Sequence, residues 1–280
     1  FGLTVGTLSG SAGGVIRSGT VGAVTFTAGS ASNSSFAGLI ENGNGTVAFT
    51  KAGSGSLTLT AANTYTGLTT VSDGSLVVNG SLVGDVSIAA AGSLGGSGSV
   101  AAIGGAGLVG PGNSPGILTA TSIDPTAGLS FGFEITQADP NYLDATASGN
   151  DLLWLTGGNP FASSLSAANS VNVYFTQAAL DLGTLTGGFF TANTADFIAS
   201  IDQGTFQYFV QDAAGSVTYN GLTYKTLADY DASKNVNVST VAANGGRVMQ
   251  MVVVPEPGTL ALAGMGAAIA AWTLARRRRA

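Results

Sequence analysis

The amino-acid sequence predicts an all-β protein with a parallel β-helix towards its N-terminal end and a single transmembrane helix at its C-terminal end. Three observations support this prediction: short segments in which apolar and hydroxyl side chains alternate, glycine-rich turns between them, and a long uncharged run near the end of the chain. The segments recur about every ten residues over residues 1–125, which fits either a parallel β-helix or a meander of β-hairpins. We favour the β-helix, because the segments are short and the turns are long and irregular.

The composition fits this fold class. The chain has 280 residues, of which 43 are glycine, 45% are hydrophobic and only 9% are charged. The apolar fraction is sufficient for a core, but the charged fraction is far below the usual quarter of residues. A soluble globular enzyme rarely has this composition, whereas stacked β-coils with many turns often do.

Cysteine and histidine are both absent from the sequence. Their absence excludes disulfides, thiolate metal sites and a Ser-His-Asp triad. The formal net charge is −6, and residues 1–254 hold five of the nine basic residues and 14 of the 15 acidic ones. This distribution argues against nucleic acid as a partner, because nucleic-acid binding needs clustered Lys and Arg. The sequence predicts neither a cofactor nor a metal site.

The first predicted strands place Leu, Val or Phe on one face and Thr or Ser on the other. They cover residues 24–27, 46–50, 57–60, 69–71, 76–79 and 86–88.

One stretch, residues 53–80, carries three linked motifs: Gly-x-Leu-x-Leu-Thr, Asn-Thr-Tyr-x-Gly and Thr-x-Val-x-x-Gly-x-Leu. This stretch resembles the autotransporter-associated β-strand repeat, and the resemblance implies a right-handed parallel β-helix coil. A second passage, residues 110–119, resembles the tail of the passengers that carry this repeat. The matching residues of the repeat are Leu57, Leu59, Thr60, Asn63, Thr64, Tyr65, Gly67, Thr70, Val71, Gly74 and Leu76.

Within this coil we expect three glycines, Gly67, Gly74 and Gly80, to take positive φ at corners. Asn63 is expected to bond the backbone of its own turn or to stack with an equivalent Asn. Tyr65 is expected to pack at a corner.

Residues 126–254 have less glycine and more aromatic residues than the first region. We interpret them as the last coils leading into a β-rich cap or sandwich-like module, because an open coil end would expose strand edges. Short helices are predicted at 177–182 and 194–201. The predicted strands are 129–135, 151–156, 170–175, 205–211, 216–219, 236–241 and 247–254.

Four carboxylates, Glu134, Asp139, Asp144 and Asp151, cluster in this region. Glycoside hydrolysis would need two of them at one cleft, and we favour a structural role for Glu134 and Asp151 instead. Asp139, Asn141 and Asp144 could supply oxygen ligands for calcium, but their spacing is not that of an EF-hand, which favours a solvated loop.

The chain ends in a three-part tail formed by residues 255–280. Pro255-Glu256-Pro257 comes first, the uncharged run from Gly258 to Ala275 follows, and Arg276, Arg277, Arg278 and Arg279 come last. As a helix the run would span about 26 Å, close to the roughly 30 Å of a bilayer core. The arginines orient the span by the positive-inside rule, and the two prolines predict an extended, accessible hinge before it.

This tail resembles the PEP-CTERM sorting signal of Gram-negative bacteria. The resemblance implies that an exosortase, a membrane protease or transpeptidase, recognises Pro255, Glu256 and Pro257. Alternatives for the tail are a permanent membrane anchor and a buried helix. No signal peptide is visible at Phe1, and we expect that a leader has been removed or lies outside this sequence.

The sequence therefore predicts an exported, non-enzymatic surface or matrix protein with three parts: residues 1–125, 126–254 and 255–280. It would be anchored transiently by its C-terminal helix, then released to the cell surface or matrix, with a structural or adhesive role in biofilm or exopolysaccharide. Its expected partners are the exosortase, the membrane before processing, and exopolysaccharide or other surface proteins. The alternatives are a permanently anchored adhesin and a β-helix polysaccharide-degrading enzyme.

Overall fold

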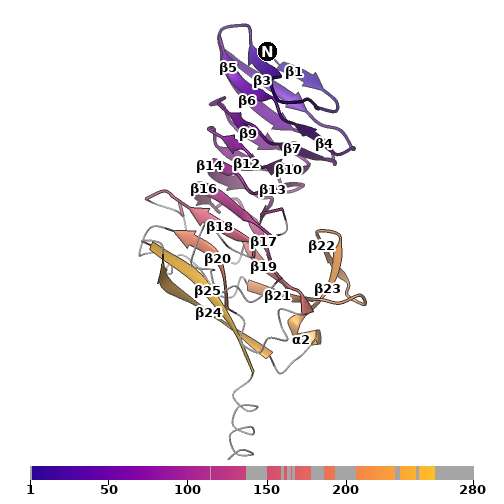
Figure 1. Cartoon of the computed structure of the whole chain (residues 1–280), viewed down its shortest axis with the longest axis vertical. Coiled ribbons are helices and arrows are strands. Elements are labelled where there is room, and N and C mark those ends of the chain that lie inside the picture. The colour runs from indigo at the N-terminus through magenta and orange to yellow at the C-terminus, as the bar shows by residue number, and fades with distance from the viewer. Residues whose placement is uncertain are drawn as a thin grey trace, which may run out of the picture.

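The chain forms an elongated stack of β-strands, with residue 2 near one end and the last strands at the other (Figure 1). The fold is given by a computed structural model. It describes residues 2–113, 115–136, 150–158, 161–162, 165, 168–177, 186–192, 206–230, 234–243 and 246–255.

Within this described part, the strands belong to two long sheets and one short sheet. The first sheet contains β1 (Gly2–Val5), β3 (Ala23–Ala28), β6 (Thr46–Lys51), β9 (Thr69–Val71), β12 (Val86–Ile88), β14 (Ser99–Gly105), β16 (Ile117–Asp124), β18 (Leu152–Leu155), β20 (Thr186–Ala192), β25 (Gly246–Pro255) and β24 (Lys234–Ala243) in that order, with β8 (Ala62–Asn63) and β11 (Ser81–Leu82) joined at its side. The second sheet contains β22 (Val217–Tyr219), β23 (Leu222–Thr226), β21 (Phe206–Gln211), β19 (Ser170–Phe175), β17 (Ser130–Ile135), β15 (Leu108–Pro111), β13 (Gly92–Gly96), β10 (Gly74–Val78), β7 (Ser56–Leu59) and β4 (Ser34–Phe36). The third sheet pairs β2 (Val15–Ser18) with β5 (Leu39–Gly43).

Successive coils pair in parallel, with equivalent side chains in register. Phe26 lies opposite Phe49 in the first sheet, and Leu76 lies between Leu57 and Leu94 in the second. Every strand pair from β1 to β16 is parallel. The preference for parallel coils over a hairpin meander is therefore confirmed.

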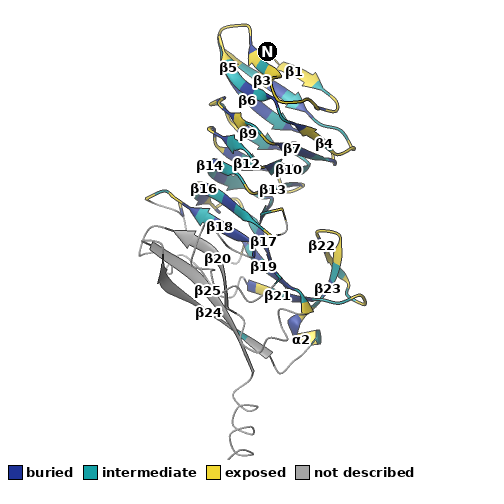
Figure 2. Ribbon diagram, viewed as in Figure 1, coloured by how far each residue is buried: buried dark blue, intermediate teal, exposed yellow. Residues whose placement is uncertain are grey.

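The core runs along the inside of the stack (Figure 2). Leu57, Leu76 and Leu94 are buried in one row, and the rings of Phe26 and Phe49 lie 5.8 Å apart in another. Each buried apolar Å² contributes about 25 cal/mol. Because each coil touches only its neighbours, stability accumulates along the stack.

The parallel pairing does not stop at residue 125. β15 pairs with β17 and β16 pairs with β18, so both long sheets continue into the aromatic-rich region. The seven strands predicted there are all present, as β17, β18, β19, β21, β22, β24 and β25. Residues 194–201, one predicted helix, lie outside the described residues, as does the other beyond Gln177.

Both long sheets end in antiparallel strands. β20, β25 and β24 close the first sheet, and β21, β23 and β22 close the second. A short helix, α2 (Leu227–Tyr230), follows β23. These strands cover the end of the stack, as the predicted cap requires, and the boundary at residue 125 stays a prediction.

The prediction for the corner glycines is right at only one of three positions. Gly74 has a φ of +64°, whereas Gly67 and Gly80 do not have a positive φ. A Cβ on Gly67 would lie 2.4 Å from the carbonyl oxygen of Val47, and one on Gly80 would lie 2.0 Å from that of Ala61. Those two positions therefore need glycine because the neighbouring coil passes too close for a side chain.

Candidate functional site

The sorting box begins at the very end of the last strand. Pro255 is the final residue of β25 and is in register with Lys234 of β24, next to the pair formed by Val254 and Asn235. The predicted hinge was placed from Pro255 onward, and this is wrong by one residue, because strand pairing extends through Pro255. Proline lacks an N–H, so it is tolerated at a strand end where that group is not needed.

The rest of the tail lies outside the described residues: Glu256, Pro257, the run from 258 to 275 and Arg276 to Arg279. Within the described ranges, no helix has both the length and the apolar character needed to cross a membrane. The predicted transmembrane helix falls wholly in the remaining part of the sequence.

Two of the four candidate carboxylates, Glu134 and Asp151, meet between the two long sheets. Asp151 directly precedes β18, and its two carboxylate oxygens accept the backbone N–H groups of Glu134 at 2.9 Å and Gly116 at 3.0 Å. The Asp151 side chain thus ties the start of a strand in the first sheet to β17 of the second. Asp139 and Asp144, with Asn141, lie outside the described residues.

Burial dominates the electrostatics of this pair. Asp151 is 0% exposed and Glu134 is 2% exposed. Removal from water raises the pKa of Asp151 to about 8, against the two N–H groups that favour its charged form, and the neighbouring Glu134 carboxylate adds to the rise.

The β22–β23 hairpin lies over Glu134 on the outer face of the second sheet. Tyr224 Oη donates to Glu134 Oε1 at 3.3 Å, and Asn220 Nδ2 donates to Glu134 Oε2 at 3.3 Å. The hydroxyl of Tyr219 donates to the carbonyl of Gly132 at 3.1 Å. A Cβ on Gly132 would come within 2.8 Å of the Tyr219 ring, so glycine at that position lets the hairpin approach the sheet.

An aromatic cluster fixes the same hairpin. The ring of Tyr219 stacks on Tyr174 with centroids 4.0 Å apart, and Tyr174 also stacks on Phe209 at 5.1 Å. Tyr224 meets Tyr174 edge-on at 4.9 Å. Such pairs contribute about 0.5–1.5 kcal/mol each beyond burial. Glu134 and Asp151 are therefore parts of a packed contact beneath the hairpin, whereas glycan hydrolysis would need both carboxyls at a cleft.

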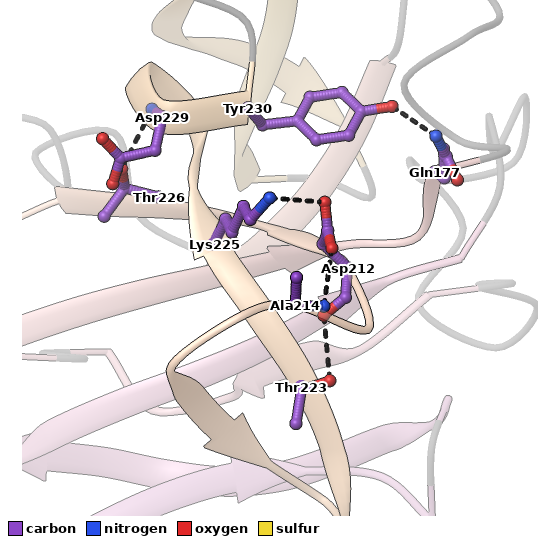
Figure 3. Close-up of polar contacts among 8 residues, drawn as sticks. All are labelled: Gln177, Asp212, Ala214, Thr223, Lys225, Thr226, Asp229 and Tyr230. Atoms are coloured by element: carbon purple, nitrogen blue, oxygen red, sulfur yellow. Dashed lines mark hydrogen bonds and ion pairs between the residues drawn. The ribbon is translucent and has the colours of Figure 1, made fainter.

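Polar contacts at the base of the hairpin hold it in place (Figure 3). Lys225 Nζ lies 3.1 Å from Asp212 Oδ2, and the Thr223 hydroxyl donates to the Asp212 carbonyl at 2.9 Å. The backbone N–H of Ala214 donates to Asp212 Oδ1 at 2.8 Å, and together with Lys225 it lowers the pKa of the Asp212 carboxyl.

A shallow groove of about 220 Å³ lies beside the hairpin tip. Its floor includes Gly95 and Gly110, which face each other in the register of β13 and β15. Hydroxyl and amide groups line it, and no charged side chain does. The polar lining residues are Ser75, Ser93, Asn113, Tyr219 and Asn220.

One lysine of the repeat, Lys51, is buried in a purely structural setting. Its Nζ donates to the carbonyls of Ala52 at 3.0 Å, Gly53 at 2.7 Å and Asp73 at 3.0 Å. Desolvation lowers its pKa, partly offset by the charge of Asp73. The sequence contained a signal for this burial, because Val47, Phe49 and Lys51 share the inward parity of β6.

The expectations for Asn63 and Tyr65 are confirmed as packing roles. Asn63 Oδ1 accepts the N–H of Ile40 at 2.9 Å, while its Nδ2 donates to Ala61 O at 3.0 Å and to Ser81 O at 3.4 Å. Its amide thus serves its own turn and the coils on both sides. Tyr65 is fully buried, and its hydroxyl bonds that of Thr69 at 2.7 Å.

Comparison with protein families identifies both resemblances seen in the sequence. Residues 49–78 match the passenger-associated-transport repeat, and residues 253–279 match the PEP-CTERM protein-sorting motif. No curated protein matches the chain. The first match covers the coil from the end of β6 to the end of β10. The second begins inside β25 and covers the three-part tail. The sorting motif implies export and recognition by an exosortase, and the repeat suggests a surface protein.

Proposed function

We propose that this protein is a non-enzymatic structural or adhesive component of a bacterial biofilm or exopolysaccharide matrix. The observation that carries the proposal is the sorting motif at residues 253–279, which directly follows a stack of β-coils. In this account an exosortase processes the tail and releases the body to the cell surface or the matrix. The resemblance of the repeat adds a right-handed twist to the coils.

The tail would work in two steps. The run from Gly258 to Ala275 holds the chain in the membrane, and Arg276 to Arg279 keep its end on the cytoplasmic side. Pro255, Glu256 and Pro257 then lie at the outer face, where the exosortase cleaves. The membrane contact is transient in this account.

The surface of the body suits a structural role. Outward positions on the coils are mostly Thr, Ser, Asn and Gly, and charge is sparse. The groove beside the hairpin tip has hydroxyl and amide groups without a charged side chain, which suits contact with a neutral exopolysaccharide. No bond-making residue is needed for such contact.

A double substitution, Pro255→Ala with Pro257→Ala, tests the role of the box. The variant should accumulate in the inner-membrane fraction, because the exosortase no longer recognises it, while the wild type reaches the surface and culture fractions. Immunoblots of fractionated cells measure this. Pro115→Ala, at an exposed position between β15 and β16, is the matched control and should behave as the wild type. Equal distribution of the double variant and the wild type would contradict the proposal.

The second candidate is a permanently anchored adhesin, which the same uncharged run and arginine cluster favour. An anchored adhesin would keep residues 258–280 in its mature form and would not depend on Pro255 or Pro257. The fractionation experiment therefore separates the two candidates.

A further inference from the structure

We propose that the fold sets the position of processing: the chain is cut between Pro255 and Gly258, and the mature protein keeps β25 complete. This inference rests on the proposed exosortase processing and adds the site at which it occurs. It follows from how β25 is paired and from where the uncharged run begins.

β25 is an interior strand of the first sheet. It lies between β20 and β24. Its pairing with β20 extends to Val252, opposite Thr186, and its pairing with β24 extends to Pro255, opposite Lys234. The backbone is therefore engaged on both sides up to Val252 and on one side up to Pro255.

Pairing of this kind protects the peptide bonds of β25. A peptidase acts on a locally opened segment, so a bond inside a paired strand is cut only when that strand detaches. Detaching β25 would also leave β20 and β24 with unpaired edges. Cleavage anywhere upstream of Pro255 thus requires the cap to open, and the upstream limit of processing is the Pro255–Glu256 bond.

The downstream limit comes from the sequence. The run that starts at Gly258 is uncharged and is placed in the bilayer in the proposed function. Hydrolysis breaks the amide C–N bond, adds the hydroxyl of water to the carbonyl carbon of the body and leaves the proton on the amine of the released tail. The bonds between Pro255 and Gly258 remain as the site of this step.

The spacing has a consequence for the enzyme. Pro255 and Gly258 are joined by about 11 Å of fully extended chain. Before processing, the cap formed by β20, β25 and β24 must then lie close to the membrane surface. The exosortase has to act beside the folded cap, with no flexible spacer between the two.

The mature C-terminus of the full chain, co-expressed with an exosortase, tests the proposal. Intact mass and C-terminal peptide mass spectrometry should place it at Pro255, Glu256 or Pro257. A terminus within residues 246–254 or inside the run from 258 to 275 would overturn this inference and leave the proposed processing standing. An intact tail ending in Ala280 would overturn both.

Protection of β25 can be measured independently with trypsin, because Arg247 lies in β25 and opposite Ala192 of β20. In the native full chain, kept in detergent, trypsin should cut at Arg276 to Arg279 and leave the bond after Arg247 intact. The same chain unfolded in denaturant is the control and should be cut at both places. Cleavage after Arg247 in the native chain at the rate of the unfolded chain would remove the physical basis of the proposal.

Discussion

At the scale of single residues, Asp151 makes the stability of the protein depend on pH. Its pKa rises from an ordinary value of 3.8 to about 8 in the folded chain, so the folded state holds the proton more tightly than the unfolded state. The resulting stabilisation is complete below about pH 4 and is lost as the pH rises to 8. The slope from this one group cannot exceed about 1.4 kcal/mol per pH unit.

Denaturant unfolding at pH 5 and at pH 8 measures this effect. The wild type should be more stable at pH 5, and Asp151→Asn should abolish most of the difference, since the variant has no carboxyl to titrate. Asp124→Asn is the matched control: this carboxyl is exposed and its pKa is lowered by Thr126, so the variant should keep the slope between pH 5 and 8. An unchanged slope in Asp151→Asn would contradict the assignment.

Tyr224 gives a second prediction at this scale. Tyr224→Phe removes the hydroxyl that donates to the buried Glu134 carboxylate, which should cost about 1.5–3 kcal/mol. It should also speed hydrogen exchange in β22 and β23. Tyr230→Phe, which loses an exposed hydroxyl bonded to Gln177, should cost far less. Equal effects of the two variants would show that the contact with Glu134 does not fix the hairpin.

Local sequence patterns predicted some residue roles and failed for others. The alternation in β6 and β7 assigned the inward side chains correctly, because parity within a strand is a local property. The reason for Gly67 and Gly80 was wrong, because the atoms that exclude a side chain there belong to neighbouring coils. The contact of Tyr224 with Glu134 joins residues 90 positions apart, and no local pattern contains that information.

At the scale of elements, each coil depends on its stacked row of apolar side chains. Leu76 is fully buried between Leu57 and Leu94, so Leu76→Ala should cost about 2–5 kcal/mol in the free energy of unfolding. Val77 points to the opposite face of β10 and is only half-buried, so Val77→Ala should cost less than half as much. Denaturant titration of both variants checks this. A larger loss for Val77→Ala would mean that the inward and outward faces are exchanged.

Most elements were predictable and two were not. Seven of the strands after residue 126 follow from alternation and aromatic content, but β20 reads Thr-Gly-Gly-Phe-Phe-Thr-Ala, and its adjacent pairs break the alternation. The helix α2 has four residues, too few to show a helical period. The end of β25 was placed one residue early, because proline was taken as a strand terminator while the partner strand β24 continues to pair with it.

At the scale of the whole molecule, the stack separates two tasks. Parallel coils extend the body, and the antiparallel strands at its far end close both sheets (Figure 1). The sorting box begins where the last of these strands ends. The cap therefore both covers the core and presents the box, which links the completion of the fold to the site of processing.

The tail was the most predictable part of the molecule, because its three parts are contiguous in the sequence and each has a simple physical meaning. The arrangement of the cap was the least predictable, since it joins β20, β24 and β25 through pairs that lie far apart in the chain.

The central claim is that the tail is removed when the protein reaches its destination. The most direct test is C-terminal peptide mass spectrometry of the protein recovered from the outer-surface and culture fractions of the native cell. The account predicts no peptide from residues 259–280 and a terminus at the Pro255–Pro257 box. An intact, arginine-rich tail on the mature protein would contradict it and would identify a membrane-anchored adhesin.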